Sequence, residues 1–224
     1  IKNATVNATG KRGYAYAIYS AASTAAANGG LLLGDVELTD VTVNAVTESV
    51  TADGKTTNYN IAYCLYVQAT QTTGTGADNT GVEYAAGAKM TVNSGTYTAT
   101  TTGTNAYSAV TGQRSITFNE GAEGFPELII HGGKFVANAG TSGARAVSTG
   151  GYTTIDGGEF EANAGTSTAY GLYAITGKLT ANGVKVTATA QTSTAFGAYL
   201  EASVTNYDGI KAGVLNHGEM ELNN

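Results

Sequence analysis

The 224-residue sequence has little of several residue types on which other protein classes depend. It contains one Pro, one Cys, two His and no Trp, and charged residues make up 12% of the chain, about half the usual share. Because Cys64 is the only cysteine, an internal disulfide framework is excluded. His131 and His217 have no further His or Cys at ligand spacing, so we expect neither a metal site nor a cofactor.

Clustered positive charge and long apolar runs are also absent. The net charge is -6, and Lys and Arg are scattered singly, so no basic stripe exists that would bind nucleic acid. No stretch approaches the roughly 18 consecutive apolar residues of a spanning helix, so we expect no membrane insertion within this chain. The opening residues, IKNATVNATG, lack the apolar region of a signal peptide, as expected for a mature or excised fragment.

The residues that are abundant favour short strands. Gly numbers 31, and Thr, Ala and Asn are frequent, with apolar residues spread thinly and regularly between them. Thr, Val and Tyr favour strands, whereas repeated Gly and Asn interrupt helices. The Ala-rich residues 21–28 are the one segment suited to a helix, and we expect a single turn there at most.

One phrase recurs along most of the chain. It reads AYAIY at 15–19, AYCLY at 62–66, AYSAV at 106–110, ARAVS at 144–148, AYGLY at 169–173 and AFGAYL at 195–200. Successive copies start 47, 44, 38, 25 and 26 residues apart. The bare unit is therefore about 25 residues long, and the first three units carry insertions.

A second phrase follows the first and completes the unit. It consists of a strand, a polar residue usually followed by Gly, and another strand, as in LIIHGGKFVANAG at 128–140 and TTIDGGEFEANAG at 153–165. Three short strands in about 25 residues predict an all-β fold, a right-handed parallel β-helix (a β-solenoid). We expect residues 1–224 to form a single β-solenoid segment, an internal fragment that begins mid-rung. Residues 213–224 read as an interrupted rung, and the rung after Phe196 looks shortened.

Alternation of apolar and polar residues predicts which side chains face the interior. The expected interior columns are Tyr97, Phe135, Phe160 and Val186; Val92, Ile130, Ile155 and Ala181; and Ile18, Leu65, Ala109, Val147, Leu172 and Ala198. On the outer face, Lys134, Glu159 and Lys185 share one repeat position. Their alternating charge is favourable between neighbouring strands, so this column fixes the predicted register.

Polar residues repeat at one predicted corner of the rung. They are Asn93, His131, Asp156 and Asn182, which we interpret as turn residues that tolerate left-handed backbone. The nearby carboxylates Asp156, Glu159 and Glu161 could serve a glycosidase, which needs two acids facing one bond. Since the rung neighbours of Glu159 are lysines, we favour a solvated, ion-paired face and expect no catalysis.

Aromatic residues form two further columns. The first contains Tyr16, Tyr63, Tyr107, Tyr170 and Phe196, with Arg145 in the same place of its rung. An outward column of this kind would suit stacking on sugar rings. However, its residues lie two positions before residues such as Ile18 and Leu65, which we expect inside, and alternate residues of a strand share a face. We therefore favour stacking inside the core. The alternative exposed ladder, and a candidate binding surface, comprises Tyr19, Tyr66, Tyr173 and Tyr199.

Three insertions, at about 20–34, 67–88 and 111–127, all follow the first strand of a rung. We therefore expect them to emerge at one corner, where binding loops on a rigid scaffold are usually found. The insertion 111–127 is the leading candidate for a contact site, although a loop that only covers the core edge is an equal alternative. Its candidate binding residues are Arg114, Phe118, Glu120 and Phe125.

The Gly-rich, Thr/Asn-rich and cysteine-poor repeat AYGLYAITGKLTANGVKVTATA at 169–190 resembles the passenger domains of bacterial autotransporters and related β-helical adhesins. That resemblance implies export to the cell surface and a role in attachment, autoaggregation or biofilm. The partners it implies are host surface glycans or proteins, or other copies of the chain. Gram-positive surface proteins and phage fibres show similar repeats. A carbohydrate-active β-helix enzyme and the subunit of an end-to-end filament are the alternative functions.

Overall fold

The computed structural model describes most of the chain. The residues outside the description are 12, 22, 26–29, 33–34, 49, 53–54, 58–59, 69–70, 73–82, 85–87, 112–117, 120–125, 176, 201–213, 216–217 and 224. All regular structure in the described residues is β-strand, in agreement with the predicted all-β class.

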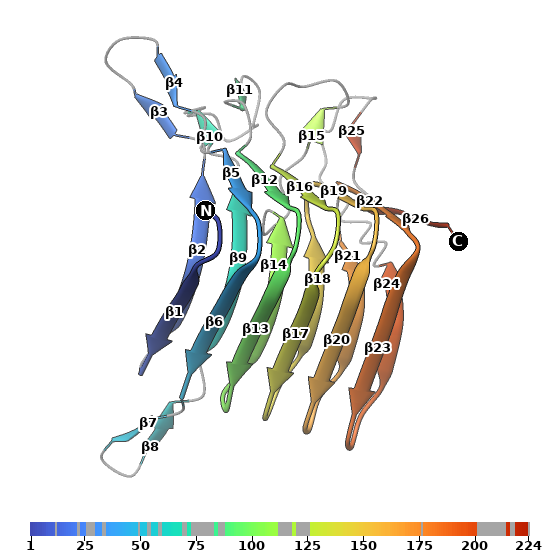
Figure 1. Ribbon diagram of the computed structural model, residues 1–224. Helices are drawn as coiled ribbons and strands as arrows, with labels where there is room; N and C mark the ends of the chain where they lie inside the picture. The colour runs from blue at the N-terminus through green and yellow to red at the C-terminus, as the bar shows by residue number, and fades with distance from the viewer. Residues whose placement is uncertain are drawn as a thin grey trace.

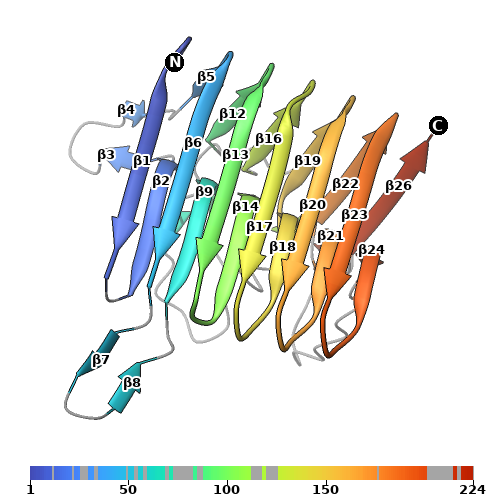
Figure 2. The same ribbon diagram turned by 60° about the horizontal axis from the view of Figure 1, so that its bottom comes forward.

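Eighteen of the strands form three parallel sheets of six strands each (Figures 1 and 2). Sheet 1 contains, in order, β1 (Thr5–Gly10), β6 (Val41–Thr47), β13 (Gly95–Thr101), β17 (Lys134–Ala139), β20 (Gly158–Ala164) and β23 (Val184–Ala190). Sheet 2 contains β2 (Tyr14–Ala21), β9 (Ile61–Gln68), β14 (Asn105–Thr111), β18 (Ala144–Thr149), β21 (Ala169–Ala174) and β24 (Ala195–Leu200). Sheet 3 contains β5 (Val36–Leu38), β12 (Lys89–Val92), β16 (Glu127–Ile130), β19 (Tyr152–Ile155), β22 (Gly177–Asn182) and β26 (Gly218–Asn223).

The chain visits the three sheets in a fixed cycle, from sheet 1 to sheet 2 to sheet 3 and back, and each cycle adds one strand to every sheet. The protein is therefore a right-handed parallel β-helix with three strands per rung, as predicted. Figure 2 shows sheet 1 in front, with its strands side by side in chain order. The opening residues form β1, the first strand of sheet 1, which pairs in parallel with β6.

The predicted register is also confirmed. Lys134 pairs with Glu159, and Glu159 pairs with Lys185. The interior columns pair as expected, and two of them extend further: Val43 and Leu38 join the columns of Tyr97 and Val92. One continuous core of apolar side chains fills the space between the three sheets.

Aromatic stacking and buried polar contacts hold the interior together. The rings of Tyr97 and Phe135 lie 4.7 Å apart and those of Phe135 and Phe160 5.1 Å apart, all in sheet 1. The buried Tyr97 hydroxyl donates a hydrogen bond to the Ser94 carbonyl oxygen at 2.8 Å. The Cys64 thiol is also buried and points to the Val43 carbonyl oxygen at 3.7 Å, and burial raises its pKa to about 12.

The three predicted insertions leave the rungs at the corner between sheets 2 and 3, as expected (Figure 1). The insertion after β2 forms an antiparallel pair, β3 (Ser23–Ala25) with β4 (Gly30–Leu32), so the described residues of 21–28 lie in strands and not in the single helical turn that was allowed there. The insertion after β9 contains the paired strands β10 (Gln71–Thr72) and β11 (Glu83–Tyr84). Antiparallel pairing within one loop satisfies the backbone locally, which a short Ala-rich helix ending at Gly would do less well.

A fourth insertion leaves the same corner after β24. It carries β25 (Val214–Leu215), which pairs with β15 (Phe118–Asn119) from the insertion after β14. The chain then returns as β26, which pairs in parallel with β22. The rung after Phe196 is therefore lengthened, and its predicted shortening is wrong because the inserted residues were read as part of the rung.

A further hairpin lies at a different corner and was not predicted. Strands β7 (Val50–Ala52) and β8 (Lys55–Thr57) pair between β6 and β9, at the corner of sheets 1 and 2 (Figure 1). The insertions therefore do not all share one corner. The hairpin accounts for part of the long spacing between the first two copies of the repeated phrase.

The polar column at the corner of sheets 3 and 1 has a different role from the one predicted. The glycines that follow it, Gly133 and Gly158, adopt the left-handed backbone, each with φ of 117°. The polar residues do not; their side chains contact the next rung instead. Asn182 donates to Asp156 at 3.1 Å, and His131 Nδ1 lies 3.3 Å from Asp156 Oδ2. Glycine supplies the turn, and the polar side chains form a ladder along the corner.

Candidate binding surface on sheet 2

Every strand of sheet 2 breaks the alternation of inward and outward residues once. In β9, Cys64 and Leu65 both belong to the main core, while Tyr63 and Tyr66 belong to a separate cluster on the other side of the sheet. The ladder pairing also steps over this position, since no pair joins Cys64 to Ser108. Two outward residues per strand are therefore three positions apart, and both aromatic columns lie on the outer face.

This break corrects the prediction that the column of Tyr16 stacks inside the core. The prediction assumed an uninterrupted period of two, under which Tyr63 and Leu65 must share a face. The Ser108 side chain shows which residues face inward, because its hydroxyl donates to the Tyr97 carbonyl oxygen of sheet 1 at 2.7 Å. Tyr107, next to Ser108, consequently points outward.

The first aromatic column runs along the solenoid and is interrupted at Arg145. The ring centroids of Tyr16 and Tyr63 are 4.8 Å apart with planes at 2°, and those of Tyr63 and Tyr107 are 5.0 Å apart with planes at 11°. Beyond the next rung, Tyr170 stacks on Phe196 at 5.6 Å. Such offset-parallel contacts are favourable and accumulate when each rung repeats the same position.

The second column is interrupted in the middle. Tyr19 stacks on Tyr66 at 5.3 Å, and Tyr173 stacks on Tyr199 at 5.6 Å. Between these two pairs the register places Val110 and then Ser148. The small side chain at Ser148 leaves space beside Tyr173, and a neighbour from the first column occupies it.

That neighbour is Arg145, which bridges the two columns. Its guanidinium carbon lies 5.1 Å from the ring centroid of Tyr107, 5.2 Å from that of Tyr170 and 4.5 Å from that of Tyr173. Its Nη1 donates a hydrogen bond to the Tyr107 hydroxyl. A cation over aromatic faces is attracted by the ring quadrupole, so Arg145 continues the stack where an aromatic residue is absent.

Exposure divides the surface into a covered centre and accessible flanks. Tyr63 is 1% exposed and Tyr107 is 3% exposed, whereas Tyr16 and Tyr19 are 41% and 51% exposed. Arg145 and Tyr170 are half-buried. Burial, reinforced by the neighbouring phenols of Tyr107 and Tyr16, raises the pKa of Tyr63 well above its usual value of 10.0.

The predicted candidate residues are therefore only partly exposed. Of the second column, Tyr19 is exposed and Tyr199 is half-buried, while Tyr66 and Tyr173 are buried. Of the loop candidates, Arg114, Glu120 and Phe125 lie outside the described residues, and Phe118 is placed only by the backbone pairing of β15 with β25. The role of Arg145 could have been anticipated from its place in the aromatic column and from Ser148 three residues later.

The carboxylates considered for catalysis all have partners. Glu159 Oε1 lies 3.2 Å from Lys185 Nζ, and Glu161 Oε2 lies 3.6 Å from Lys134 Nζ. Lys134 therefore reaches diagonally to Glu161, although its direct register partner is Glu159. Within the described part of the chain, no group of three or more His, Cys, Asp or Glu side chains is arranged to hold a metal ion.

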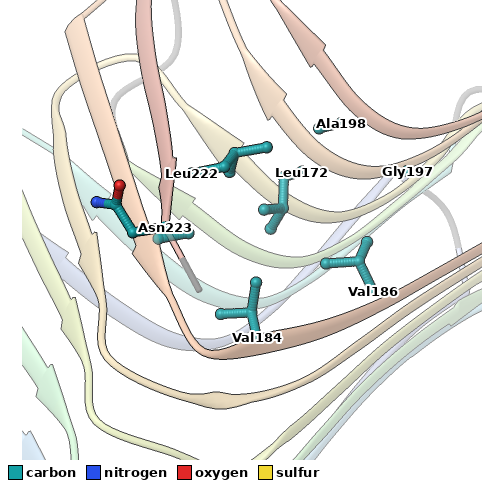
Figure 3. A pocket seen from close by; sticks show the side chains of 8 residues that line it. Leu172, Val184, Val186, Gly197, Ala198, Leu222 and Asn223 are labelled. Carbon is teal, nitrogen blue, oxygen red and sulfur yellow. The ribbon is translucent and has the colours of Figure 1, made fainter.

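A hollow of about 400 Å³ lies among the last strands of the three sheets (Figure 3). Its lining consists of Leu172, Ala181, Val184, Val186, Gly197, Ala198, Leu222 and Asn223. None of these residues is an acid or a base, and the Asn223 amide donates to Asn182 at 3.0 Å as part of the corner ladder. The hollow continues the apolar interior and carries no reactive group.

Among the described residues, no helix is long and apolar enough to cross a membrane. No protein-family profile, no curated protein and no solved structure matches the chain, so the surface of sheet 2 is interpreted from its own geometry.

Proposed function

We propose that this β-solenoid is a non-catalytic binding scaffold of an extracellular surface, and that it attaches to surface glycans through the outer face of sheet 2. The observation that carries the proposal is the aromatic and arginine surface formed by Tyr16, Tyr63, Tyr107, Arg145 and Tyr170. Tyr63 and Tyr107 are covered, and the accessible part of this surface consists of the exposed Tyr16 and the half-buried Arg145 and Tyr170. Accessible aromatic clusters of this kind often mark a contact site.

The scaffold suits display because its geometry is rigid. Each strand of sheet 2 between β2 and β24 pairs on both sides, and the rungs hold equivalent side chains in line. A preorganised surface loses little conformational entropy when a ligand binds, which favours repetitive ligands that contact several rungs. In this proposal, a surface protein or another copy of the chain would bind to the same face of sheet 2 in place of the glycan.

The chemistry of the chain also supports a binding role. The ion pairs of Glu159 and Glu161 leave neither carboxylate free as an acid or base opposite another acid. An extracellular location is supported by the scarcity of Cys and the Thr/Asn-rich composition.

The proposal is tested by measuring the binding of the whole chain to a panel of immobilised neutral and acidic polysaccharides. Tyr170→Ala removes a half-buried ring next to Arg145, and we expect it to lower the affinity about tenfold. Lys185→Ala, on the outer face of sheet 1, is the matched control and should leave binding unchanged. If no polysaccharide binds, or both variants lose binding equally, the proposal is wrong.

A further inference from the structure

Among the described residues of the three sheets, Arg145 is the cation that lies over aromatic rings. It is the only charged residue in the six strands of sheet 2. In sheet 1, by contrast, Lys134 and Lys185 each pair with a glutamate, and in sheet 3 Lys89 pairs with Glu127 at 3.3 Å. Among the described residues, Arg145 makes no ion pair, so its charge has no anionic partner in the fold.

The guanidinium is also incompletely hydrogen-bonded. Nη1 donates to the Tyr107 hydroxyl, whereas the buried Nε has no hydrogen-bond partner. The rings of Tyr107, Tyr170 and Tyr173 attract the cation but do not neutralise it. Because Nε is buried, an anion can reach only the outer part of the half-buried guanidinium, where the neighbouring rings screen its charge less than water would.

We propose that Arg145 is the anion-recognition residue of the sheet 2 surface, and that the ligand is an acidic glycan bearing carboxylate or sulfate groups. This inference rests on the proposed function and names the substrate class of the same site. The guanidinium binds the anionic group of one sugar, and the flanking Tyr170 contacts the sugar ring. Since the chain carries a net charge of -6, attraction of the acidic polymer is local to this surface.

A glycan fits the surface better than an acidic peptide. Peptides commonly add a strand to an exposed sheet edge, but β18 is paired with β14 on one side and β21 on the other, so its backbone groups are occupied. A glycan needs only side-chain rings, hydroxyls and the cation, and this face offers all three.

The test measures the affinity of the whole chain for oligogalacturonate, sulfated dextran and neutral dextran by calorimetry. We expect the wild type to bind one or both acidic polymers about tenfold more tightly than neutral dextran, with the difference shrinking as salt rises. Arg145→Gln should abolish this difference, so that the variant binds acidic and neutral polymers with equal affinity. Arg145→Lys, which keeps the charge but not the planar fork, should retain part of it. Lys134→Gln on sheet 1 is the control for general charge and should have no effect.

The outcomes separate the two proposals. If the wild type binds neutral and acidic polymers equally, or Arg145→Gln keeps the acidic preference, the anion site is wrong while the glycan-binding function stands. If no polymer binds, the proposed function fails and the anion site fails with it. Tighter binding to an acidic peptide or to single-stranded DNA than to either acidic polymer would also overturn the inference. Circular dichroism melts of both Arg145 variants show whether the fold is retained, and Arg145→Lys provides the comparison if Arg145→Gln does not fold.

Discussion

The outer faces of sheets 1 and 2 are built on the same parallel stacking but hold their side chains in different ways. On sheet 1, Lys134, Glu161, Glu159 and Lys185 form ion pairs in which at least part of every side chain is exposed. On sheet 2, Arg145 lies against three tyrosine rings and has no carboxylate partner among the described residues. A repeat can therefore hold a cation either in an exposed ion pair or against half-buried aromatic rings. The second arrangement leaves the positive charge available for a ligand.

The largest expected difference between the two faces is at alkaline pH. Burial raises the pKa of the Tyr63 phenol above its unfolded value of 10.0. Below pH 10 this phenol is therefore protonated in both the folded and the unfolded chain. Above pH 10 the unfolded phenol ionises first, and the folded state loses about 1.4 kcal/mol of stability for each further pH unit. Urea unfolding measured from pH 9 to pH 12 should show this loss.

Tyr63→Phe keeps the stacked ring and removes the phenol, so it should move the alkaline transition to higher pH. Tyr14→Phe, at an exposed position, is the matched control. The transition should not vanish in Tyr63→Phe, because burial also raises the pKa of Tyr97 and of Cys64. An unchanged transition in Tyr63→Phe would show that the aromatic face does not limit alkaline stability.

A smaller effect is expected from replacing the cation of sheet 2. Arg145→Met retains most of the side-chain length and loses the interaction with the three rings, which should lower the free energy of unfolding by about 0.5–2 kcal/mol. Because the guanidinium is half-buried and its partners are uncharged, 1 M NaCl should change this difference little. Denaturant unfolding at low and high salt measures it, and a strong salt dependence would point to an ionic partner instead.

The smallest effect is expected on sheet 1. Lys185→Met removes the ion pair with Glu159, in which the side chains are 72% and 52% exposed. Exposed ion pairs contribute at most about 1 kcal/mol, and salt screens them. The same unfolding measurements should therefore give a small loss at low salt and none at 1 M NaCl. A loss as large as that of Arg145→Met would remove the distinction between the two faces.

Local sequence was sufficient to predict the number of strands per rung and the register. Phe135 and Phe160 occupy identical places in two uninterrupted units, and 25 residues separate them, so their pairing follows from the repeat itself. The charge alternation of Lys134, Glu159 and Lys185 gave independent support because those side chains are adjacent only in that register.

The insertions and the candidate site were less predictable. The hairpin of β7 and β8 lies inside a long spacing, and nothing in a spacing says at which corner the extra residues leave. The pairing of β15 with β25 joins two insertions from distant rungs, and such contacts depend on where the scaffold places both loops.

By itself, the sequence determined the stacked rungs and the columns of equivalent residues, because a repeat of short strands has one way to bury its small apolar residues in register. Only the tertiary structure decided which way the aromatic columns face. Each strand of sheet 2 turns two consecutive residues inward, as at Cys64 and Leu65. The residues that precede this break in the strand therefore face the opposite side from the one that strict alternation would give. The break places Arg145 on the outer face among tyrosines, although it lies two residues before the inward Val147.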